Sequence, residues 1–247
     1  MTFGTTDGSF PGGSLTASTD ATGMASLNIL TGTVSGTGTV IATENGVMVS
    51  SSYTSVAGAA NTTSSSVVLS PAALKVNGTG SLSVTLKDAN NNPVITAPTV
   101  TVSGGTTLGA ASQSGNVFTY VVTAAAAPET ASFTVTSGGN TVGSANLVIS
   151  AYPLTVSDGA VALTNGNSQY DFQNGNAHTF TVAESNYPGA FSVTSSNTAA
   201  ASASISGGVL TVTPNGTAGL STITVTDTFG QSFTFTVSVT TGSLTIN

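Results

Sequence analysis

The dominant pattern of the chain is an alternation of apolar and polar positions. Apolar side chains stand at every second residue in many short stretches, among them Leu82/Val84/Leu86, Phe180/Val182, Leu210/Val212 and Phe233/Phe235/Val237/Val239. Because successive side chains of a β-strand point to opposite faces, this period of two predicts strands with one buried face. The pattern recurs along the whole chain and therefore predicts an all-β protein.

Turn-forming residues separate these stretches. Asn-Gly or Gly-Gly pairs stand at Asn45–Gly46, Gly138–Gly139, Asn165–Gly166, Asn174–Gly175, Gly207–Gly208 and Asn215–Gly216. Both residue types tolerate the positive φ that tight hairpins need. Asp88-Ala-Asn-Asn-Asn-Pro93 joins the predicted strands Ser81–Leu86 and Thr99–Val102 in the same way, since Asp and Asn side chains bond to nearby backbone. No stretch has the apolar stripe of a helix, and Ala124–Ala127 runs into Pro128, which favours a loop or strand edge.

Two stretches divide the chain into three segments. Small residues from Gly58 to Ser66 indicate a first linker, and Ala151-Tyr152-Pro153 marks a second junction. Segment one covers residues 1–57, segment two residues 67–151 and segment three residues 152–241, with a tail at 242–247. Segments two and three approach the ~100 residues of an immunoglobulin-type sandwich. The predicted fold is a series of tandem antiparallel β-sandwiches in an elongated array.

Composition excludes several classes of function. Only 4% of the residues are charged, the formal net charge is −7, and the only cationic side chains are Lys75 and Lys87. Without a basic patch we expect no binding to nucleic acid and no attraction to anionic membranes. The chain has no Cys and no apolar run of the ~20 residues that a membrane helix needs. A surface of Ser, Thr, Asn and Gly suits an exported protein. No signal peptide is recognisable, so we expect that one has been removed or that the chain is an excerpt.

A search for catalytic chemistry yields no site. The sequence shows no Gly-x-Ser-x-Gly elbow and no phosphate-binding Gly-Lys-Ser/Thr loop, and its single His178 cannot build a histidine-rich metal site. A glycosidase pair is conceivable, for example Asp171 with Glu184, but the alternating strands give no sign of a cleft. We therefore predict no catalytic, cofactor-binding or metal-ligating residues, no required cofactor, and no enzymatic activity.

The acidic residues concentrate at turns. Asp7, Asp20, Asp88, Asp158 and Asp227 each precede or begin a Gly- or Asn-containing turn, which predicts Asx-type hydrogen bonding to the backbone. The alternative is calcium at a segment junction, for which Asp158 is the best candidate, although calcium needs six to eight oxygen ligands. With nine acids and one His, we also expect little dependence of stability on pH. Asn61, Asn77 and Asn215 fit the N-glycosylation acceptor pattern, and whether they carry glycans depends on the organism.

Several motifs carry a resemblance to a known family. The order Leu86-Lys-Asp-Ala-Asn-Asn-Asn-Pro-Val94, followed by a Val-rich strand, resembles the first half of a bacterial immunoglobulin-like domain of the invasin/intimin type. In segment one, Thr19-Asp-Ala-Thr-Gly-Met-Ala25 and the hairpin from Thr39 to Val47 resemble the second half of the same domain. Segment three, from Ser196 to Val239, resembles a second bacterial Ig-like family that is common on cell-surface and phage virion proteins. The resemblance implies fold and setting more than a partner.

Under this comparison segment one lacks its opening strands. Met1–Gly8 matches a mid-domain strand and turn, so nothing corresponds to Ser81–Pro93 of segment two. Either the missing strands precede Met1 in a longer chain, or another subunit supplies a strand in trans. The tail Gly242–Asn247 is the candidate donor, because Leu244 and Ile246 alternate beyond the last predicted strand of segment three.

The favoured function is that of an extracellular structural protein: a rod-like stalk, a filament subunit or an adhesin segment that polymerises head-to-tail by strand addition. The alternative is a carbohydrate- or receptor-binding module of a bacterial surface or virion protein, with a host or cell-surface glycan or protein as partner. Aromatic side chains discriminate between the two, and Tyr170, Phe172 and Tyr187 make segment three the best place for a sugar site. Both readings place the protein outside the cell, at the cell surface or on a virion.

Overall fold

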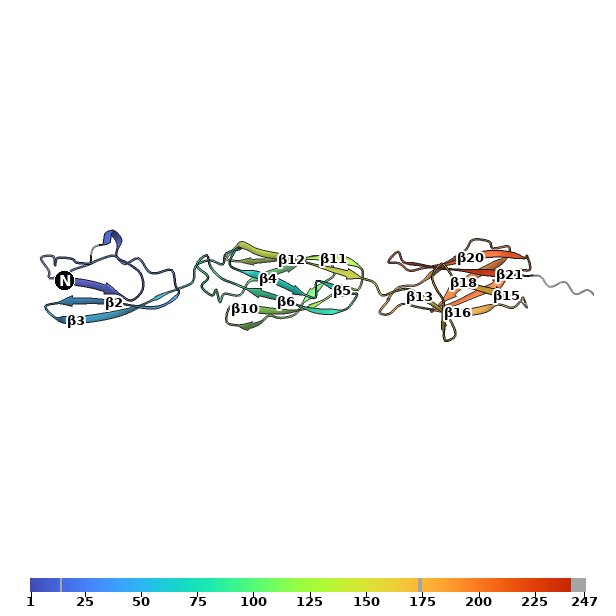
Figure 1. Cartoon of the computed structure of the whole chain (residues 1–247), viewed down its shortest axis with the longest axis horizontal. Helices are drawn as coiled ribbons and strands as arrows, with labels where there is room; N and C mark the ends of the chain where they lie inside the picture. The colour runs from blue at the N-terminus through green and yellow to red at the C-terminus, as the bar shows by residue number, and fades with distance from the viewer. Residues whose placement is uncertain (14, 173–174, 241–247) are drawn as a thin grey trace, which may run out of the picture. The chain divides into compact units, whose positions relative to one another are not determined.

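A computed structural model describes residues 1–13, 15–172 and 175–240 of the chain (Figure 1). The described residues form strands joined by turns and loops, with one short 3-10 turn, η1, at Pro11–Gly13. Ala124–Ala127 lies between two strands, as predicted. No helix among the described residues is long and apolar enough to cross a membrane. The candidate donor tail and Asn174 of the predicted Asn174–Gly175 turn lie outside the described residues.

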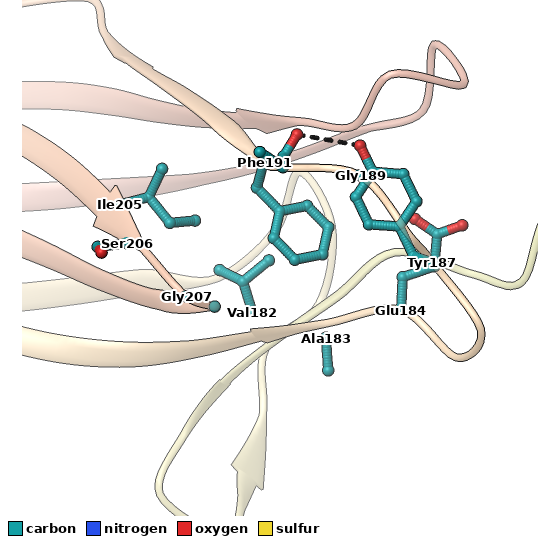
Figure 2. Close-up of a pocket in the computed structure, with 11 residues that line it drawn as sticks. Val182, Ala183, Glu184, Tyr187, Gly189, Phe191, Ile205, Ser206 and Gly207 are labelled. Atoms are coloured by element: carbon teal, nitrogen blue, oxygen red, sulfur yellow. Dashed lines mark hydrogen bonds between the residues drawn. The ribbon is translucent and has the colours of Figure 1, made fainter.

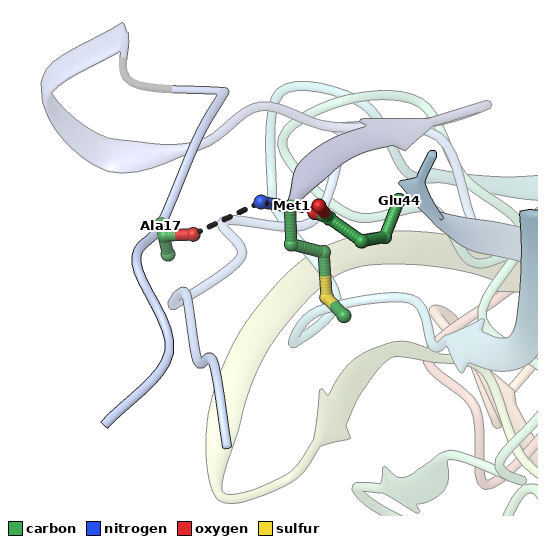
Figure 3. A network of polar contacts seen from close by, with 3 residues as sticks. All are labelled: Met1, Ala17 and Glu44. Atoms are coloured by element: carbon green, nitrogen blue, oxygen red, sulfur yellow. Dashed lines mark hydrogen bonds and ion pairs between the residues drawn. The ribbon is translucent and has the colours of Figure 1, made fainter. Parts of the chain in front are cut away.

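Segment one contributes a single antiparallel sheet in the order β1-β2-β3. Its strands are β1 (Thr2–Thr5), β2 (Gly36–Glu44) and β3 (Val47–Ser55). The predicted Asn45–Gly46 turn joins β2 to β3, and both of its residues have positive φ. At the start of β1 the Met1 ammonium pairs with Glu44 at 2.7 Å and donates to the carbonyl oxygen of Ala17 at 3.3 Å (Figure 3).

Segment two contains two sheets. The first has the order β4-β6-β10-β8 with β9 also on β10: β4 (Ser66–Ser70), β6 (Thr79–Thr85), β8 (Thr107–Leu108), β9 (Ser112–Ser114) and β10 (Val117–Thr123). The second has the order β5-β12-β11-β7: β5 (Ala73–Lys75), β7 (Thr99–Val102), β11 (Glu129–Ser137) and β12 (Asn140–Ser150). Strand β5 runs parallel to β12 on the outer edge of this sheet.

Segment three repeats the plan. One sheet has the order β14-β13-β16-β19-β18: β13 (Thr155–Asp158), β14 (Val161–Ala162), β16 (His178–Ala183), β18 (Ala201–Ser206) and β19 (Val209–Pro214). The other has the order β15-β21-β20-β17: β15 (Gln169–Phe172), β17 (Ser192–Ser195), β20 (Gly219–Thr226) and β21 (Ser232–Val239). Again a short strand, β15, lies parallel on the outer edge of the last strand.

The core of segment three is built from the alternating positions of both sheets. Phe180, Leu210, Ile223 and Phe235 are 0–1% exposed and belong to one apolar cluster. Phe180 and Phe235 come from different sheets and their ring centroids lie 4.9 Å apart. Burial of each such side chain contributes about 1.5–3 kcal/mol, so the two facing sheets form a stable sandwich.

By its internal contacts the chain divides into two compact units. The first holds Met1–Ala72, Thr79–Thr123 and Ala131–Leu147, and the second holds Ala73–Gly78, Ala124–Thr130 and the chain from Val148 onward. The segment boundaries at 57, 67, 151 and 241 therefore stay a prediction. Below, segments one to three are used only as names for those residue ranges.

Candidate functional site

The turn that begins at Asp88 is a buried hydrogen-bonding centre in the first unit. Asp88 is 4% exposed and Asn92 is 7% exposed. One carboxylate oxygen of Asp88 accepts from the backbone nitrogens of Asn90 and Asn92, each at 2.9 Å. The other accepts from the Asn92 side-chain amide and from the Gly58 nitrogen, also at 2.9 Å. The predicted Asx-type turn is confirmed here, and Asn91 within it has a φ of 65°.

Asn92 extends this centre to the chain of segment one. Its amide nitrogen donates to the carbonyl oxygen of Thr33 at 2.7 Å, and its oxygen accepts from the Ser35 nitrogen at 2.8 Å. A side-chain amide thus bonds like a backbone unit to the stretch that leads into β2. Together with the bond from Gly58 to Asp88, the turn holds both the approach to β2 and the exit from β3. We call these contacts the Asp88 clamp.

The same arrangement recurs in segment three between β20 and β21. The Asp227 nitrogen donates to the Gln231 carbonyl oxygen at 3.1 Å, and the Gln231 nitrogen returns a bond of 2.7 Å to Asp227 Oδ1. Gln231 Nε2 donates to Asp227 Oδ2 at 2.8 Å and to the carbonyl oxygen of Tyr152 at 2.9 Å. We call this the Asp227 clamp, since an amide four residues after Asp again holds the chain that enters the segment.

Segment one has the same turn without the amide. Asp20 and Met24 exchange the same pair of backbone and carboxylate bonds, at 2.8 and 3.0 Å. Met24 has no polar side-chain atom to hold a neighbouring chain, and it is 68% exposed. The side chain at the fourth position therefore decides whether this turn only closes on itself or also holds another stretch of backbone.

Electrostatics differ between the two clamps. The hydrogen bond from the Asn92 amide, with those from the backbone, lowers the pKa of Asp88 to about 2 against the opposing effect of burial. At the Asp227 clamp, Glu184 stands beside Asp227, and its Oε1 accepts from Gln231 Nε2 at 3.1 Å. Burial first, and then the hydrogen bond and charge of Asp227, raise the pKa of Glu184 to about 7. Its Oε2 is buried without a hydrogen-bond partner.

Glu184 also lines an open cavity of about 570 Å³ in segment three. Figure 2 shows Phe191 between Val182 and Tyr187, with the Glu184 carboxylate behind the Tyr187 ring. The Tyr187 and Phe191 rings stack with centroids 4.8 Å apart, and Phe229 meets Tyr187 edge-on at 5.2 Å. The Tyr187 hydroxyl bonds to the Ala190 carbonyl oxygen, the Thr228 hydroxyl and the Thr228 nitrogen, so it is used within the fold.

The structure separates residues that the sequence analysis considered together. Asp171 lies opposite Ser238 near the end of β21, whereas Glu184 contacts Gln231 just before β21 begins. Seven residues of extended strand span roughly 23 Å. Asp171 and Glu184 therefore form no glycosidase pair, because no glycosidic bond could contact both carboxylates.

The aromatic residues of segment three also divide between its two ends. Tyr170 stacks on His178 at 4.4 Å, at the start of β16, while Tyr187 follows the end of that strand. Phe172 is a core residue, 3% exposed. These three residues therefore form no common surface. The aromatics that line the cavity are Tyr187 and Phe191, and Phe229 packs on Tyr187 without lining it.

The side chains of His178 and Asp158 are in hydrogen-bond contact. His178 Nε2 lies 2.8 Å from Asp158 Oδ1, and both side chains are about one-third exposed. Asp158 is thus paired with an imidazole instead of with further carboxylates. Among residues 1–13, 15–172 and 175–240, no group of three or more His, Asp and Glu side chains could hold a metal ion. Calcium at Asp158 has no support in the described part of the chain.

Comparison with known proteins identifies the fold. No family model matches the chain, and no curated protein sequence is similar to it. Among solved structures, that of FdeC, an Escherichia coli adhesin, superposes with a TM-score of 0.52 at 19% identity, covering 98% of this chain and 86% of that one. The fold is that of tandem immunoglobulin-like domains. Two structures superpose less well: invasin, a bacterial integrin-binding protein (TM-score 0.45, 19% identity, 97% and 52% covered), and titin I-band fragment I67–I69 (0.40, 11%, 98% and 88%).

The Ig-like fold confirms the predicted fold class and explains the shared sheet plan. In segments two and three, a four-stranded sheet with a short parallel edge strand faces a second sheet. The sequence analysis predicted the turns at Asp88 and Asp227, but not the side-chain amides of Asn92 and Gln231 that hold a neighbouring stretch of backbone. The signal that could have found them is an Asp followed four residues later by Asn or Gln, at Asp88 and Asp227.

Proposed function

We propose that the chain is a non-catalytic structural segment of an extracellular protein: a stalk, filament subunit or adhesin segment at the cell surface. The observation that carries this proposal is the Asp88 clamp. A spacer must transmit force between its domains. Two hydrogen bonds of buried Asn92 hold Thr33 and Ser35 of segment one, and buried Asp88 accepts from the nitrogen of Gly58, which directly follows that segment. Such bonds to a buried, charged acceptor are stronger than exposed ones.

The surface composition supports the same role. The chain has two lysines and no arginine, so trypsin has only two positions to cleave. At one of them, Lys87, the backbone nitrogen donates to Ser65 Oγ at 3.0 Å and the carbonyl oxygen accepts from the Asn61 nitrogen at 2.8 Å. A protease that binds this stretch in extended form must break both hydrogen bonds. Low susceptibility to trypsin suits a protein that persists outside the cell. The adhesin FdeC has the same fold.

The location is tested on cells of the source organism. Antibodies raised against the chain should label intact cells, and electron microscopy of the native material should show the protein outside the cell envelope. Labelling that appears only after permeabilisation would contradict the proposal.

We include self-association by strand addition in the proposal, because β3 ends the only sheet formed by the described residues of segment one.

A second candidate function is the binding of a carbohydrate or receptor. The open cavity beside Tyr187 and Phe191 favours it, since stacked rings next to a carboxylate can hold the apolar face of a sugar and one of its hydroxyls. Glycan-array binding that Phe191→Ala abolishes would support this function. Phe229→Ala is the control, because Phe229 packs on Tyr187 and does not line the cavity.

A further inference from the structure

Strand β18 is an open edge of segment three. It ends the sheet β14-β13-β16-β19-β18, and among the described residues it pairs only with β19. With the six residues Ala201–Ser206 it is the longest edge strand of segments two and three, and it contains no charged residue and no proline. Proteins usually protect an edge with charges, proline or very short strands. The equivalent edge of segment two is protected in this way, because only the short strands β8 and β9 lie there.

Hairpin geometry shows which backbone groups of β18 are available. The two-residue turn that follows β18 makes Ser206 and Val209 a hydrogen-bonded pair. Such pairs alternate along an antiparallel ladder, so the residues between them bond away from the partner strand. The N–H and C=O groups of Ala203 and Ile205 therefore point away from β19, towards the open edge.

The contacts of Ala201 confirm this direction, since Ala201 alternates in the same phase as Ala203. Its nitrogen donates to the Asn197 carbonyl oxygen at 3.0 Å, and its carbonyl oxygen accepts from Ser195 Oγ at 2.6 Å. Within the described part of the chain, no residue bonds to the outward groups of Ala203 and Ile205. These two residues thus offer two donors and two acceptors to another strand.

The inner face of this edge opens into the cavity beside Tyr187. Ile205 lies opposite Leu210, which is 0% exposed, so the Ile205 side chain lies on the inner face. It lines the cavity of about 570 Å³ together with Phe191 and Val182 (Figure 2). Ile205 and Phe191 pack against the core but are only partly buried. A strand added to β18 places every second side chain on this face, over the cavity.

Glu184 gives the cavity its charge. It is the only acidic or basic residue among those that line the cavity. Segment three contains no lysine or arginine, because the only ones in the chain are Lys75 and Lys87. A second copy of β18 therefore brings no such cation to Glu184, whereas a different protein with a basic side chain complements its charge.

We propose that β18 accepts an extended peptide of a partner protein, with apolar side chains at alternate positions and a lysine or arginine on the same face. The outward groups of Ala203 and Ile205 bond to the peptide backbone, and its apolar side chains cover Phe191 in the cavity. Its basic group lies at Glu184. This deepens the second candidate function, receptor binding at this cavity, and rests on it.

A synthetic peptide, Lys-Thr-Val-Thr-Leu-Thr-Lys, tests the proposal. Its apolar residues and both lysines fall on one face, so it fits either strand direction. At pH 8, above the pKa of about 7 of Glu184, the complete chain should bind the labelled peptide in a fluorescence-anisotropy titration. Replacing both lysines with glutamate should weaken binding roughly tenfold, because like charges then meet at Glu184.

A second peptide tests the backbone bonds. N-methylation of the valine and of the threonine after it should weaken binding roughly tenfold, because one of these two N–H groups must face β18. No binding of the lysine peptide at millimolar concentration overturns the proposal, and so does equal binding of all three peptides.

Variants of the chain locate the acceptor. Ala203→Pro removes one outward N–H, whereas Ala203→Ser keeps it. Affinity for the lysine peptide should fall roughly tenfold in Ala203→Pro and stay unchanged in Ala203→Ser. Phe191→Ala should also weaken binding, with Phe229→Ala as its control, because Phe229 does not line the cavity. Thermal melts establish which variants fold, and the N-methylated peptide tests the same bonds without altering the chain. Equal affinity of Ala203→Pro and Ala203→Ser overturns the assigned edge.

A carbohydrate in the cavity would give a different pattern. Glycan binding that Phe191→Ala abolishes and Ala203→Pro retains, with no binding of the lysine peptide, overturns the peptide partner and leaves a sugar site. Surface labelling of cells is independent of these results, so failure of peptide binding leaves the structural role standing.

Discussion

The side-chain amide of Asn92 donates to the Asp88 carboxylate at 2.9 Å, and both residues are buried. The same amide holds Thr33 of segment one. The Asn92 side chain therefore joins the charged turn of segment two to the chain of segment one. The Asp227–Gln231 pair repeats the relationship in segment three. The predictions below concern these two clamps and the residues beside them.

Asn92→Ala should destabilise the chain by roughly 1–3 kcal/mol, because it leaves the buried Asp88 carboxylate and the Thr33 carbonyl oxygen without their shared partner. Urea unfolding measures the loss. Asn90→Ala is the matched control, since the Asn90 side chain is exposed and only its backbone nitrogen bonds to Asp88. Trypsin gives a second readout: cleavage after Lys87 should accelerate in Asn92→Ala more than in Asn90→Ala. Equal stability of the two variants would show that the clamp contributes nothing.

Asp88 should make the chain sensitive to acid. Its folded pKa of about 2 lies below the ordinary value of 3.8, so the ionised form is favoured by folding. The contribution to stability is present above pH 4 and is lost as the pH falls through 2. Asp88→Asn should lower stability at neutral pH and flatten this dependence. Melting temperatures between pH 5 and pH 2 measure it, and parallel curves for the two proteins would contradict the prediction.

Glu184 should produce the opposite dependence at higher pH. Its folded pKa of about 7 lies above the ordinary 4.5, so folding favours the protonated form. Stability from this group is present below pH 4.5 and declines as the pH rises through 7. The nine acids therefore do not titrate uniformly, and the expectation of weak pH dependence is wrong at this residue. Glu184→Gln should remove the decline between pH 5 and pH 8, whereas Asp171→Asn, an exposed carboxylate of the same segment, should retain it.

Tyr187→Phe should destabilise segment three by about 1 kcal/mol, because the Thr228 nitrogen loses its bond of 2.7 Å to the hydroxyl. The ring stacking with Phe191 should persist, so the cavity should keep its shape. Chemical denaturation gives the loss, and near-ultraviolet dichroism reports the aromatic packing. Tyr152→Phe serves as a comparison, because the Asp227 clamp uses the Tyr152 backbone oxygen and not its ring. A larger loss for Tyr152→Phe would point to another role for that ring.

Much of the fold was predictable because it follows from local periodicity. The strand Thr99–Val102 and the hairpin turns at Asn45–Gly46 and Gly207–Gly208 are where the pattern places them. The site residues were harder to predict because they depend on tertiary contacts. Burial, and then the nearby Asp227, raises the pKa of Glu184, and 43 positions of sequence separate these two acids. The sequence likewise places Tyr170 and Tyr187 in one segment, but it does not show that they lie beside opposite ends of β16.

The two clamps also expose the protein to slow chemical ageing. Hydrolysis of the Asn92 or Gln231 amide to an acid would change the shape of the side chain very little. It would nevertheless replace an N–H donor with a second negative charge facing Asp88 or Asp227. A contact that now draws two stretches of backbone together would then repel. The long-term stability of this sparsely charged chain is thus tied to the survival of two amides.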